Sequence, residues 1–321
     1  MTTMRAMTMS GAGTPDVLSL QQIERPIRIS SEVLVRVVAA GVNPIDAKTR
    51  AGLGPFAAIH DFPAVLGQDF SGIVEAAPYA GHPLQPGTEV YGFVAVPRYS
   101  GAYAEYLSVP SMSVIRKPST LSHVEAAGVP VAALTAWGMV VETAKAHEGQ
   151  RILIHAGAGG VGHLAVQFAS YFGAHVIATG STRNVGWLRE LGASEVVDHS
   201  TARFDEVVDE VDAVIDLIGN AKDDTCTRSL TVLRPGGIIV TAPSNSWPTM
   251  ADEAEAAGVR ATGFQVSPDG STLAVISRLL ESGDVKVYVD RVFDLAEAAD
   301  AHAMLEEGHT RGKLVLKVAE G

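Results

Sequence analysis

A run of small residues after a short apolar stretch constrains this chain more than any other feature. Residues 151–162 read Arg-Ile-Leu-Ile-His-Ala-Gly-Ala-Gly-Gly-Val-Gly, between a predicted strand at 151–155 and a predicted helix at 161–172. In such a unit the G-x-G-x-x-G glycines allow a tight turn, approach of a pyrophosphate to the backbone, and close packing of helix on strand. A flexible loop is the alternative, but the flanking strand and helix favour a dinucleotide-binding turn made of Gly157, Gly159, Gly160, Val161 and Gly162.

From about residue 123, short apolar runs alternate with helix-like segments. The predicted strands are 151–155, 175–178, 196–197, 213–217 and 237–240, and the predicted helices are 124–142, 161–172 and 184–191. Strands that alternate with helices indicate a parallel, doubly wound sheet of the Rossmann type, and hence an α/β fold for this part.

The first part of the chain, up to about residue 122, has a different pattern. Strand-like runs at 32–39, 72–76, 89–94 and 102–108 are separated by glycine and proline, which predicts an antiparallel, barrel-like β domain. After residue 263 the pattern predicts a helix at 271–281, an extended segment at 285–289, a helix at 295–307 and a closing strand at 313–318.

The loop that should contact the adenosine ribose lies roughly 20 residues beyond the glycine turn. It reads Gly180-Ser-Thr-Arg-Asn184 and contains no Asp or Glu to repel a 2′-phosphate. Ser181 and Thr182 can donate hydrogen bonds, and Arg183 carries its charge in a fork that suits phosphate oxygens. A solvated arginine is the alternative, but the position favours NADP(H). His199, after the next strand, is either a contact to the adenine or 2′-phosphate or a plain surface histidine.

Six motifs are distributed over the whole chain. They are Ala39-Ala-Gly-Val-Asn-Pro-Ile-Asp46, Phe62-Pro-Ala-Val-Leu-Gly-Gln-Asp69, Gly101-Ala-Tyr-Ala-Glu-Tyr106, Ala133-Leu-Thr-Ala-Trp-Gly138, Ala156-Gly-Ala-Gly-Gly-Val-Gly162 and Arg311-Gly-Lys-Leu-Val-Leu316. Together they resemble the medium-chain dehydrogenase/reductase superfamily, and within it the zinc-independent quinone oxidoreductases. The resemblance implies a GroES-like catalytic domain of residues 1–122 and 263–321, a Rossmann domain of residues 123–262, and a homodimer that pairs near residues 262–267.

The alcohol dehydrogenases of that superfamily hold zinc with Cys, His and Cys, and the resemblance puts Asn43, Gln68 and Val131 at those places. None of these is a good zinc ligand, and the single cysteine, Cys226, cannot form a four-cysteine site. We therefore expect no metal. The resemblance also makes Asn43, Asp46 and Gln68 the candidate catalytic residues, two amides that donate to a substrate carbonyl and a carboxylate that orients them. A turn at Asn43 and a helix cap at Asp46 are the alternatives.

Four further positions are candidates for cofactor contacts. The resemblance places Thr135 near the nicotinamide ribose, and the alternative is a buried threonine bonded to its own helix. The strand end at Val240–Pro243 is a place where ligands bind, and its backbone could hold the carboxamide. Arg311 and Lys313 could reach cofactor phosphates, although charges that flank an edge strand are the favoured interpretation.

A cleft without zinc suits an acceptor that needs orientation more than activation. Alcohol oxidation needs a Lewis acid, whereas a quinone is already a strong hydride acceptor. We therefore expect NADPH-dependent reduction of a quinone or a similar activated carbonyl. An enone or enoyl reductase is the alternative, but Gly54 stands where enoyl-thioester reductases typically carry a tyrosine, and no tyrosine lies between Asn43 and Asp61. A non-catalytic NADPH-binding structural or sensor protein is the third possibility.

Charge and composition argue against other classes of partner. The net charge is −12 and no basic run occurs, so contact with nucleic acid or an anionic membrane is not expected. One cysteine suits a reducing cytosol, and no signal-like or membrane-spanning apolar stretch is apparent, so we expect a cytoplasmic protein whose partners are small molecules and a second copy of itself.

Overall fold

The computed structural model describes residues 2–29, 31–95, 101–221 and 223–321. The chain forms two compact units: the first runs up to Val131 and includes Ser267–Gly321, and the second is Ala132–Val266. The sequence pattern predicts these boundaries slightly earlier, after residues 122 and 262. The first boundary lies later because helix α2 (His123–Ala127) packs on strands β3 (Glu32–Val42) and β5 (Asp69–Ala76) of the first unit.

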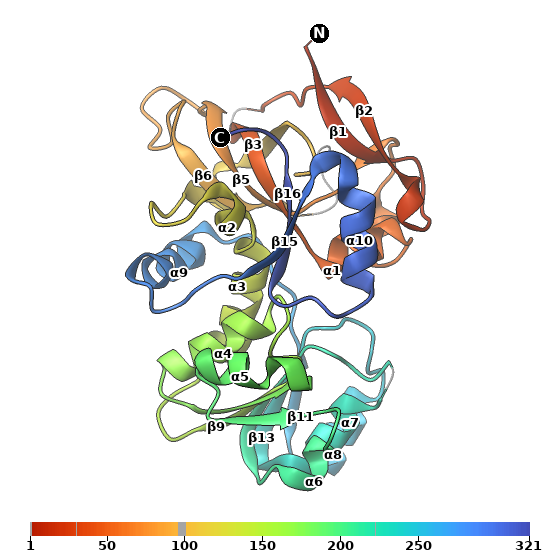
Figure 1. Ribbon diagram of the computed structural model, residues 1–321, viewed down its shortest axis with the longest axis vertical. Coiled ribbons are helices and arrows are strands. Elements are labelled where there is room, and N and C mark those ends of the chain that lie inside the picture. Colours follow the sequence, from red (N-terminus) through yellow and green to blue (C-terminus); the bar gives the residue numbers. More distant parts are fainter. Residues whose placement is uncertain (1, 30, 96–100, 222) are drawn as a thin grey trace. The chain divides into compact units, whose positions relative to one another are not determined.

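The first unit contains two β-sheets that share one apolar core. The larger sheet has the order β15 (Val289–Asp294), β16 (Lys313–Lys317), β3, β5, β6 (Glu89–Phe93) and β8 (Val114–Arg116), with β7 (Tyr106–Pro110) paired to β3 (Figure 1). The smaller sheet has the order β2 (Leu18–Glu24), β1 (Thr3–Met9) and β4 (Ala64–Val65). Side chains from both sheets, among them Met7, Val35, Phe70 and Leu314, are buried in the common core.

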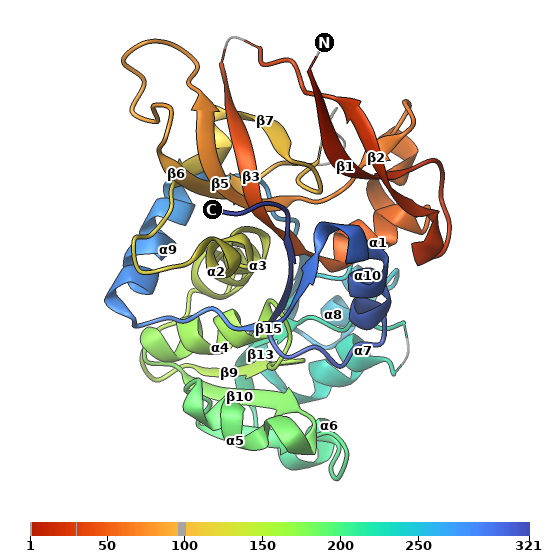
Figure 2. The same ribbon diagram turned by 45° about the horizontal axis from the view of Figure 1, so that its top comes forward.

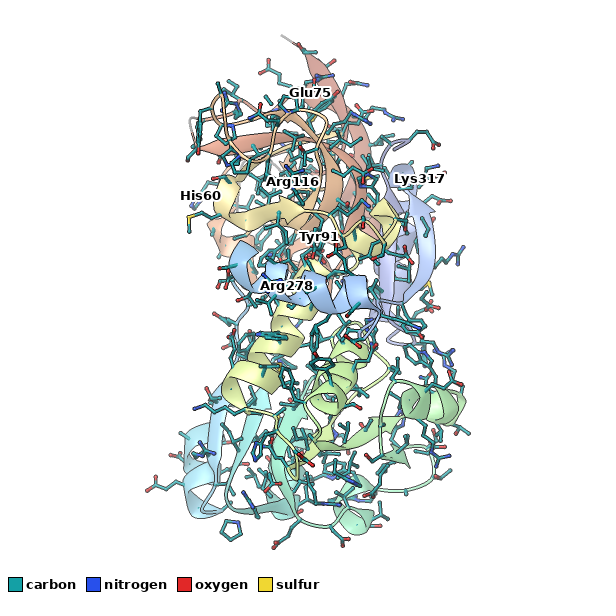
Figure 3. All side chains as sticks on the ribbon, turned by 90° about the vertical axis from the view of Figure 1, so that its left-hand side faces the viewer. His60, Glu75, Tyr91, Arg116, Arg278 and Lys317 are labelled. Carbon is teal, nitrogen blue, oxygen red and sulfur yellow. The ribbon has the colours of Figure 1, made fainter. Side chains whose placement is uncertain are left out.

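Helix α9 (Gly270–Ser282) belongs to this unit and packs beside β8. It is tied to the neighbouring strand β6 by the Tyr91 hydroxyl, which lies 2.6 Å from the hydroxyl of Ser277. Figure 3 shows this region, with Tyr91 of β6 and Arg278 of α9 labelled.

One strand pair differs in direction from the other named strand pairs of the first unit, which are antiparallel. Strands β15 and β16 run parallel, and β15 starts at Val289, where the predicted extended segment ends. Parallel neighbours need a crossover connection, and helix α10 (Ala298–Glu306) provides it. The buried residues Ala298 and Ala301 attach this helix to the core of the unit.

The single helix predicted at 124–142 is wrong, because the segment forms three pieces. They are α2, α3 (Pro130–Trp137) and one π-helical stretch, Gly138–Thr143. Pro130 has no N–H to donate to the carbonyl of Ala126, so the first helix cannot continue through it, and a new helix starts there.

The second unit is a six-stranded, all-parallel sheet, which confirms the predicted Rossmann fold. Its order is β11 (Glu195–Asp198), β10 (His175–Gly180), β9 (Arg151–Ile154), β12 (Val211–Asp216), β13 (Leu233–Thr241) and β14 (Arg260–Gly263) (Figure 2). The order reverses between β9 and β12, and dinucleotides bind at such a switch point. No helix in the described ranges is long and apolar enough to cross a membrane.

Candidate functional site

The glycine-rich turn joins β9 to helix α4 (Gly162–Tyr171) in the second unit. The Gly157 N–H donates to the Thr179 carbonyl at 2.9 Å, and the Gly159 N–H donates to the Ala156 carbonyl at 3.0 Å. Gly162 is closed in on its side: a Cβ there would lie 2.2 Å from the Ala156 carbonyl oxygen. The turn therefore requires glycine at its end for packing alone, whether or not a ligand binds.

The middle of the turn differs from its ends. Gly159, Gly160 and Val161 are partly exposed, whereas Gly157 and Gly162 are buried. A Cβ on Gly159 would approach only the Ala156 carbonyl oxygen, at 3.3 Å, and would otherwise point into open space. An open glycine backbone at the start of a helix fits a pyrophosphate, because the phosphates need close approach to backbone N–H groups.

The residues predicted to contact the ribose lie together at one corner of this sheet. Thr182 and Arg183 are exposed, and Ser181 is half-buried and accepts a hydrogen bond from the Asn184 side chain at 3.2 Å. The exposed residue His199 is brought to the same corner because its N–H donates to the Gly180 carbonyl at 3.1 Å.

A carboxylate that the sequence analysis missed shares this corner. Asp198, the last residue of β11, lies in register with Gly180 at the end of β10. Hydrogen bonds from the Thr182 side chain and from the Ser200 N–H hold the pKa of the Asp198 carboxyl below its usual range. The missing signal was strand order: the loop at 180–184 lacks an acid, but the neighbouring strand supplies one.

A pocket of about 550 Å³ lies at the carboxyl ends of β13 and β14. Thr241, Ala242 and Pro243 line it, so it occurs where the sequence predicts a ligand at 240–243. The Thr241 hydroxyl donates to the Asp216 carboxylate at 2.7 Å, and the Ala242 N–H donates to the Asp216 carbonyl at 3.0 Å, which fixes the strand end. Thr135 lies in α3 and is 7% exposed.

In the first unit, Asn43 and Asp46 lie at the start of helix α1 (Pro44–Arg50). Asn43 is the N-cap of this helix, and the Asp46 carboxylate accepts the Asn43 N–H at 3.0 Å, as the third helical residue does in a capping box. The Tyr103 hydroxyl donates to the same carboxylate oxygen at 3.3 Å and lies 3.1 Å from Nε2 of His302. All four side chains are buried.

The side-chain amide of Asn43 is held by a buried ion pair. Its Nδ2 donates to Oδ2 of Asp69 at 2.9 Å, and its Oδ1 accepts from the Lys313 ammonium. Lys313 Nζ lies 3.5 Å from the same Asp69 oxygen and donates to the Val42 carbonyl at 3.1 Å. The other oxygen of Asp69 accepts the Val131 N–H at 2.8 Å. Asn43 and Val131, which the resemblance puts at two of the three zinc-ligand places, are therefore linked through Asp69.

The interpretation of Lys313 as a charge beside an edge strand is wrong. Strand β16 lies between β15 and β3, and Lys313 is 3% exposed. The lysine is therefore part of the buried cluster around Asn43. Sequence reasoning missed this pairing because Asp69 and Lys313 are distant in the chain and meet only through the strand order.

Burial dominates the electrostatics of this cluster. It raises the pKa of Asp46 to about 7, against the hydrogen bond from Asn43. It raises the pKa of Asp69 and lowers that of Lys313, while the attraction between the two opposes both shifts. Two buried carboxyls share one ammonium, so a proton on Asp46 removes the uncompensated negative charge.

Gln68 differs from Asn43 in having an uncommitted amide. Its backbone carbonyl accepts the Val94 N–H at 2.9 Å, and its side chain is 7% exposed. The side-chain amide forms no hydrogen bond with any residue that the structure describes. Of the three candidate catalytic residues, Gln68 is thus the one whose donor N–H groups remain unused. Within the described ranges, no group of three or more His, Cys, Asp or Glu side chains is arranged to hold a metal ion.

A Rossmann unit with an open glycine turn, in one chain with a β unit formed from the first and last segments, defines a medium-chain dehydrogenase/reductase. Two family models match accordingly: the alcohol dehydrogenase GroES-like domain over residues 30–119 and the zinc-binding dehydrogenase over residues 191–316. The chain belongs to the medium-chain dehydrogenase/reductase superfamily, and it is an oxidoreductase.

Particular members of the superfamily are similar over almost the whole chain. The chloroplastic NADPH-dependent alkenal/one oxidoreductase of Arabidopsis thaliana is 35% identical, with 98% of this chain and 79% of the relative covered. The 2-methylene-furan-3-one reductase of Solanum lycopersicum has the same identity and coverage. Among solved structures, the quinone oxidoreductase from Coxiella burnetii is 36% identical with a TM-score of 0.92, over 99% of this chain and 100% of that chain.

Proposed function

We propose that this protein is an NADPH-dependent reductase that transfers hydride to a quinone or a similar activated carbonyl without zinc. The observation that carries the proposal is the glycine turn, which is closed by packing at Gly157 and Gly162 and open at Gly159–Val161. Its position beside the switch point of the sheet suits a dinucleotide. The similarity to the Coxiella quinone oxidoreductase supports the choice of acceptor.

The cofactor-binding residues have separable roles in this proposal. The open turn binds the pyrophosphate, and Ser181, Thr182, Arg183 and His199 surround the 2′-phosphate. Thr135 and the strand end at 241–243 contact the nicotinamide half. When bound, the reduced nicotinamide supplies the hydride.

For the acceptor, we propose that Gln68 donates a hydrogen bond to the substrate carbonyl, because its amide is uncommitted. Asn43 and Asp46 then act as supports: Asn43 is held by Asp69 and Lys313, and Asp46 accepts the Asn43 N–H at the start of helix α1. The Lys313 ammonium also supports catalysis without a metal, since a cation already contacts the Asn43 oxygen and would repel a second one.

The enone alternative has support of its own. The Arabidopsis and tomato relatives are named for an alkenal/one and for a methylene-furanone, in which a carbon–carbon double bond is conjugated to a carbonyl. Reduction of such a bond places a proton on carbon as well as a hydride, and so requires a proton source. The same cofactor site serves either acceptor.

The test is a screen of NADPH oxidation with a benzoquinone, a short enone, an alkenal and a saturated aldehyde, before and after exhaustive chelation. We expect the benzoquinone to react fastest and chelation to leave the rate unchanged. Faster reduction of the enone or alkenal establishes the alternative. NADPH binding without turnover of any acceptor establishes a sensor or structural role, and activity restored only by zinc refutes metal-free catalysis.

We infer, in addition, that the protein acts as a cytoplasmic homodimer. Strand β14 supports the dimer because it is the outer strand of its sheet within the described chain. The single cysteine, Cys226, is a buried free thiol, as suits a reducing compartment.

A further inference from the structure

Charges of both signs lie around residues 180–184, the loop of the second unit that is predicted to contact the ribose. Arg183 and His199 are exposed there, and Asp198 lies in register with Gly180, the residue that opens the loop. Paired strands are separated by about 4.8 Å, so the Asp198 backbone lies directly beside that residue. An anion bound in the loop would therefore encounter a carboxylate as well as the guanidinium.

One of the contacts of the Asp198 carboxylate is to the loop. Oδ1 accepts the Ser200 N–H at 2.9 Å, and the carboxylate also accepts a hydrogen bond from the Thr182 side chain. A hydroxyl has only one proton to donate. While Thr182 donates to Asp198, it can offer only lone pairs to any other group, and it cannot donate to a phosphate oxygen.

We propose that Asp198 is a specificity-determining residue that narrows the preference of this protein for NADPH over NADH. The proposal rests on the nicotinamide dinucleotide site proposed above. The Asp198 carboxylate repels a 2′-phosphate and accepts the only hydroxyl proton of Thr182. The same carboxylate can accept a hydrogen bond from the 2′-hydroxyl of NADH. The Arg183 guanidinium attracts the 2′-phosphate. The site therefore binds both cofactors, and the ratio of NADPH affinity to NADH affinity is smaller than Arg183 alone would produce.

The test measures the Kd of NADPH and of NADH, by the change in protein fluorescence, for the native protein and a set of variants. Asp198→Asn removes the charge but retains an oxygen for Thr182, and Asp198→Ala removes both. We expect Asp198→Asn to tighten NADPH binding about tenfold and to leave NADH binding unchanged or weaker, since the carboxylate repels the 2′-phosphate that only NADPH carries. Asp198→Ala should tighten NADPH binding further, because the Thr182 hydroxyl can then donate to the phosphate.

Two further variants separate a local effect of the Asp198 carboxylate on the cofactor from the general effect of removing one negative charge. Asp209→Asn removes one exposed negative charge at the amino-terminal edge of the same sheet, just before β12, and should leave the Kd ratio unchanged. Thr182→Val removes the hydroxyl, and a double-mutant cycle should show that it abolishes the additional gain in NADPH affinity of Asp198→Ala over Asp198→Asn.

The results distinguish the possible failures. If the native protein binds neither cofactor, the proposed function itself is wrong. If both cofactors bind and Asp198→Asn leaves the ratio unchanged, or weakens both equally, the role of Asp198 is overturned and the proposed function stands. If Asp198→Ala does not fold, the Kd values of NADPH and NADH for Asp198→Asn still decide the question.

Discussion

Gly159 and Gly162 belong to the same turn but are required for different reasons. A Cβ on Gly162 would lie 2.2 Å from a backbone oxygen, whereas a Cβ on Gly159 would have 3.3 Å of clearance. We expect Gly162→Ala to lower the free energy of unfolding by about 1–3 kcal/mol. Gly159→Ala should keep its Tm and lose at least about tenfold in NADPH affinity, because the methyl group fills the space for the pyrophosphate. Thermal unfolding and NADPH titration of both variants check this, and native NADPH affinity in Gly159→Ala would place the pyrophosphate elsewhere.

Arg183 tests the adenosine end of the site. Removing its side chain removes a charge-assisted hydrogen bond to the 2′-phosphate, which contributes about 1.5–3 kcal/mol to the binding free energy. We expect Arg183→Ala to weaken NADPH binding accordingly and to leave NADH binding almost unchanged. Equal loss of affinity for both cofactors would mean that Arg183 does not contact the 2′-phosphate.

Gln68 and Asn43 are both amides at zinc-ligand positions, and the structure gives them different environments. We expect Gln68→Ala to lower kcat at least about tenfold with an unchanged Tm, because it removes a donor to the carbonyl. Asn43→Ala removes a partner from both Asp69 and Lys313, and should lower the free energy of unfolding by about 2–3 kcal/mol. Steady-state kinetics and urea unfolding separate the two effects; a native kcat in Gln68→Ala would leave it only a scaffold role.

A residue's environment can be predicted from the sequence when its neighbours in space are also its neighbours in the chain. The glycine turn is determined by twelve consecutive residues, so its pattern was readable in the sequence. The environment of Asn43 depends on Asp69 and Lys313, which approach it only through the pairing of β3 with β5 and β16. Asp198 was missed for the same reason, because its neighbour Gly180 lies on another strand.

Among the helices and strands, those with buried apolar residues in a regular pattern could be predicted from the sequence. Five strands of the Rossmann sheet contain a short apolar run, and each predicted strand there overlaps a real one; β14, which has no such run, was not predicted. Strand β2 was missed because most of its side chains are exposed, and an edge strand without an apolar face has no period to detect. The break before Pro130 interrupts an alanine-rich run whose composition alone favours helix.

The outer edge of strand β14 is where we expect two copies of the chain to pair in the proposed dimer. The Phe264 N–H donates to Thr241, so by the two-residue period of a strand the N–H of Ala261 faces away from β13. Ala261→Pro should therefore remove an outward donor and yield a monomer, whereas the control Ala261→Val keeps the N–H and should remain a dimer. Light scattering after gel filtration measures both, and a monomeric native protein would reject the proposed dimer.

For the whole molecule, buried histidines should set the response to acid. Burial lowers the pKa of His302 to about 4, so the folded state favours the neutral ring and the unfolded state binds the proton first. Stability from this group is present above its ordinary pKa of 6.5 and is lost as the pH falls toward 4. Relative to His302→Gln, the native protein should lose about 1.4 kcal/mol per pH unit over that interval. Urea unfolding of both proteins at several pH values tests this; a constant difference would mean that His302 binds the proton as readily in the fold as in the unfolded chain.

The division of the chain into units also has a consequence for its synthesis on the ribosome. The nucleotide-binding unit is one continuous stretch, Ala132–Val266, and it is complete before any residue of Ser267–Gly321 has been made. Asn43 and Asp69 are translated before this unit, but the ammonium that pairs with Asp69, Lys313, belongs to strand β16 and is translated after it. A nascent chain can therefore bind a dinucleotide before the buried cluster around Asn43 exists. Translation of strand β16 then completes the buried cluster around Asn43.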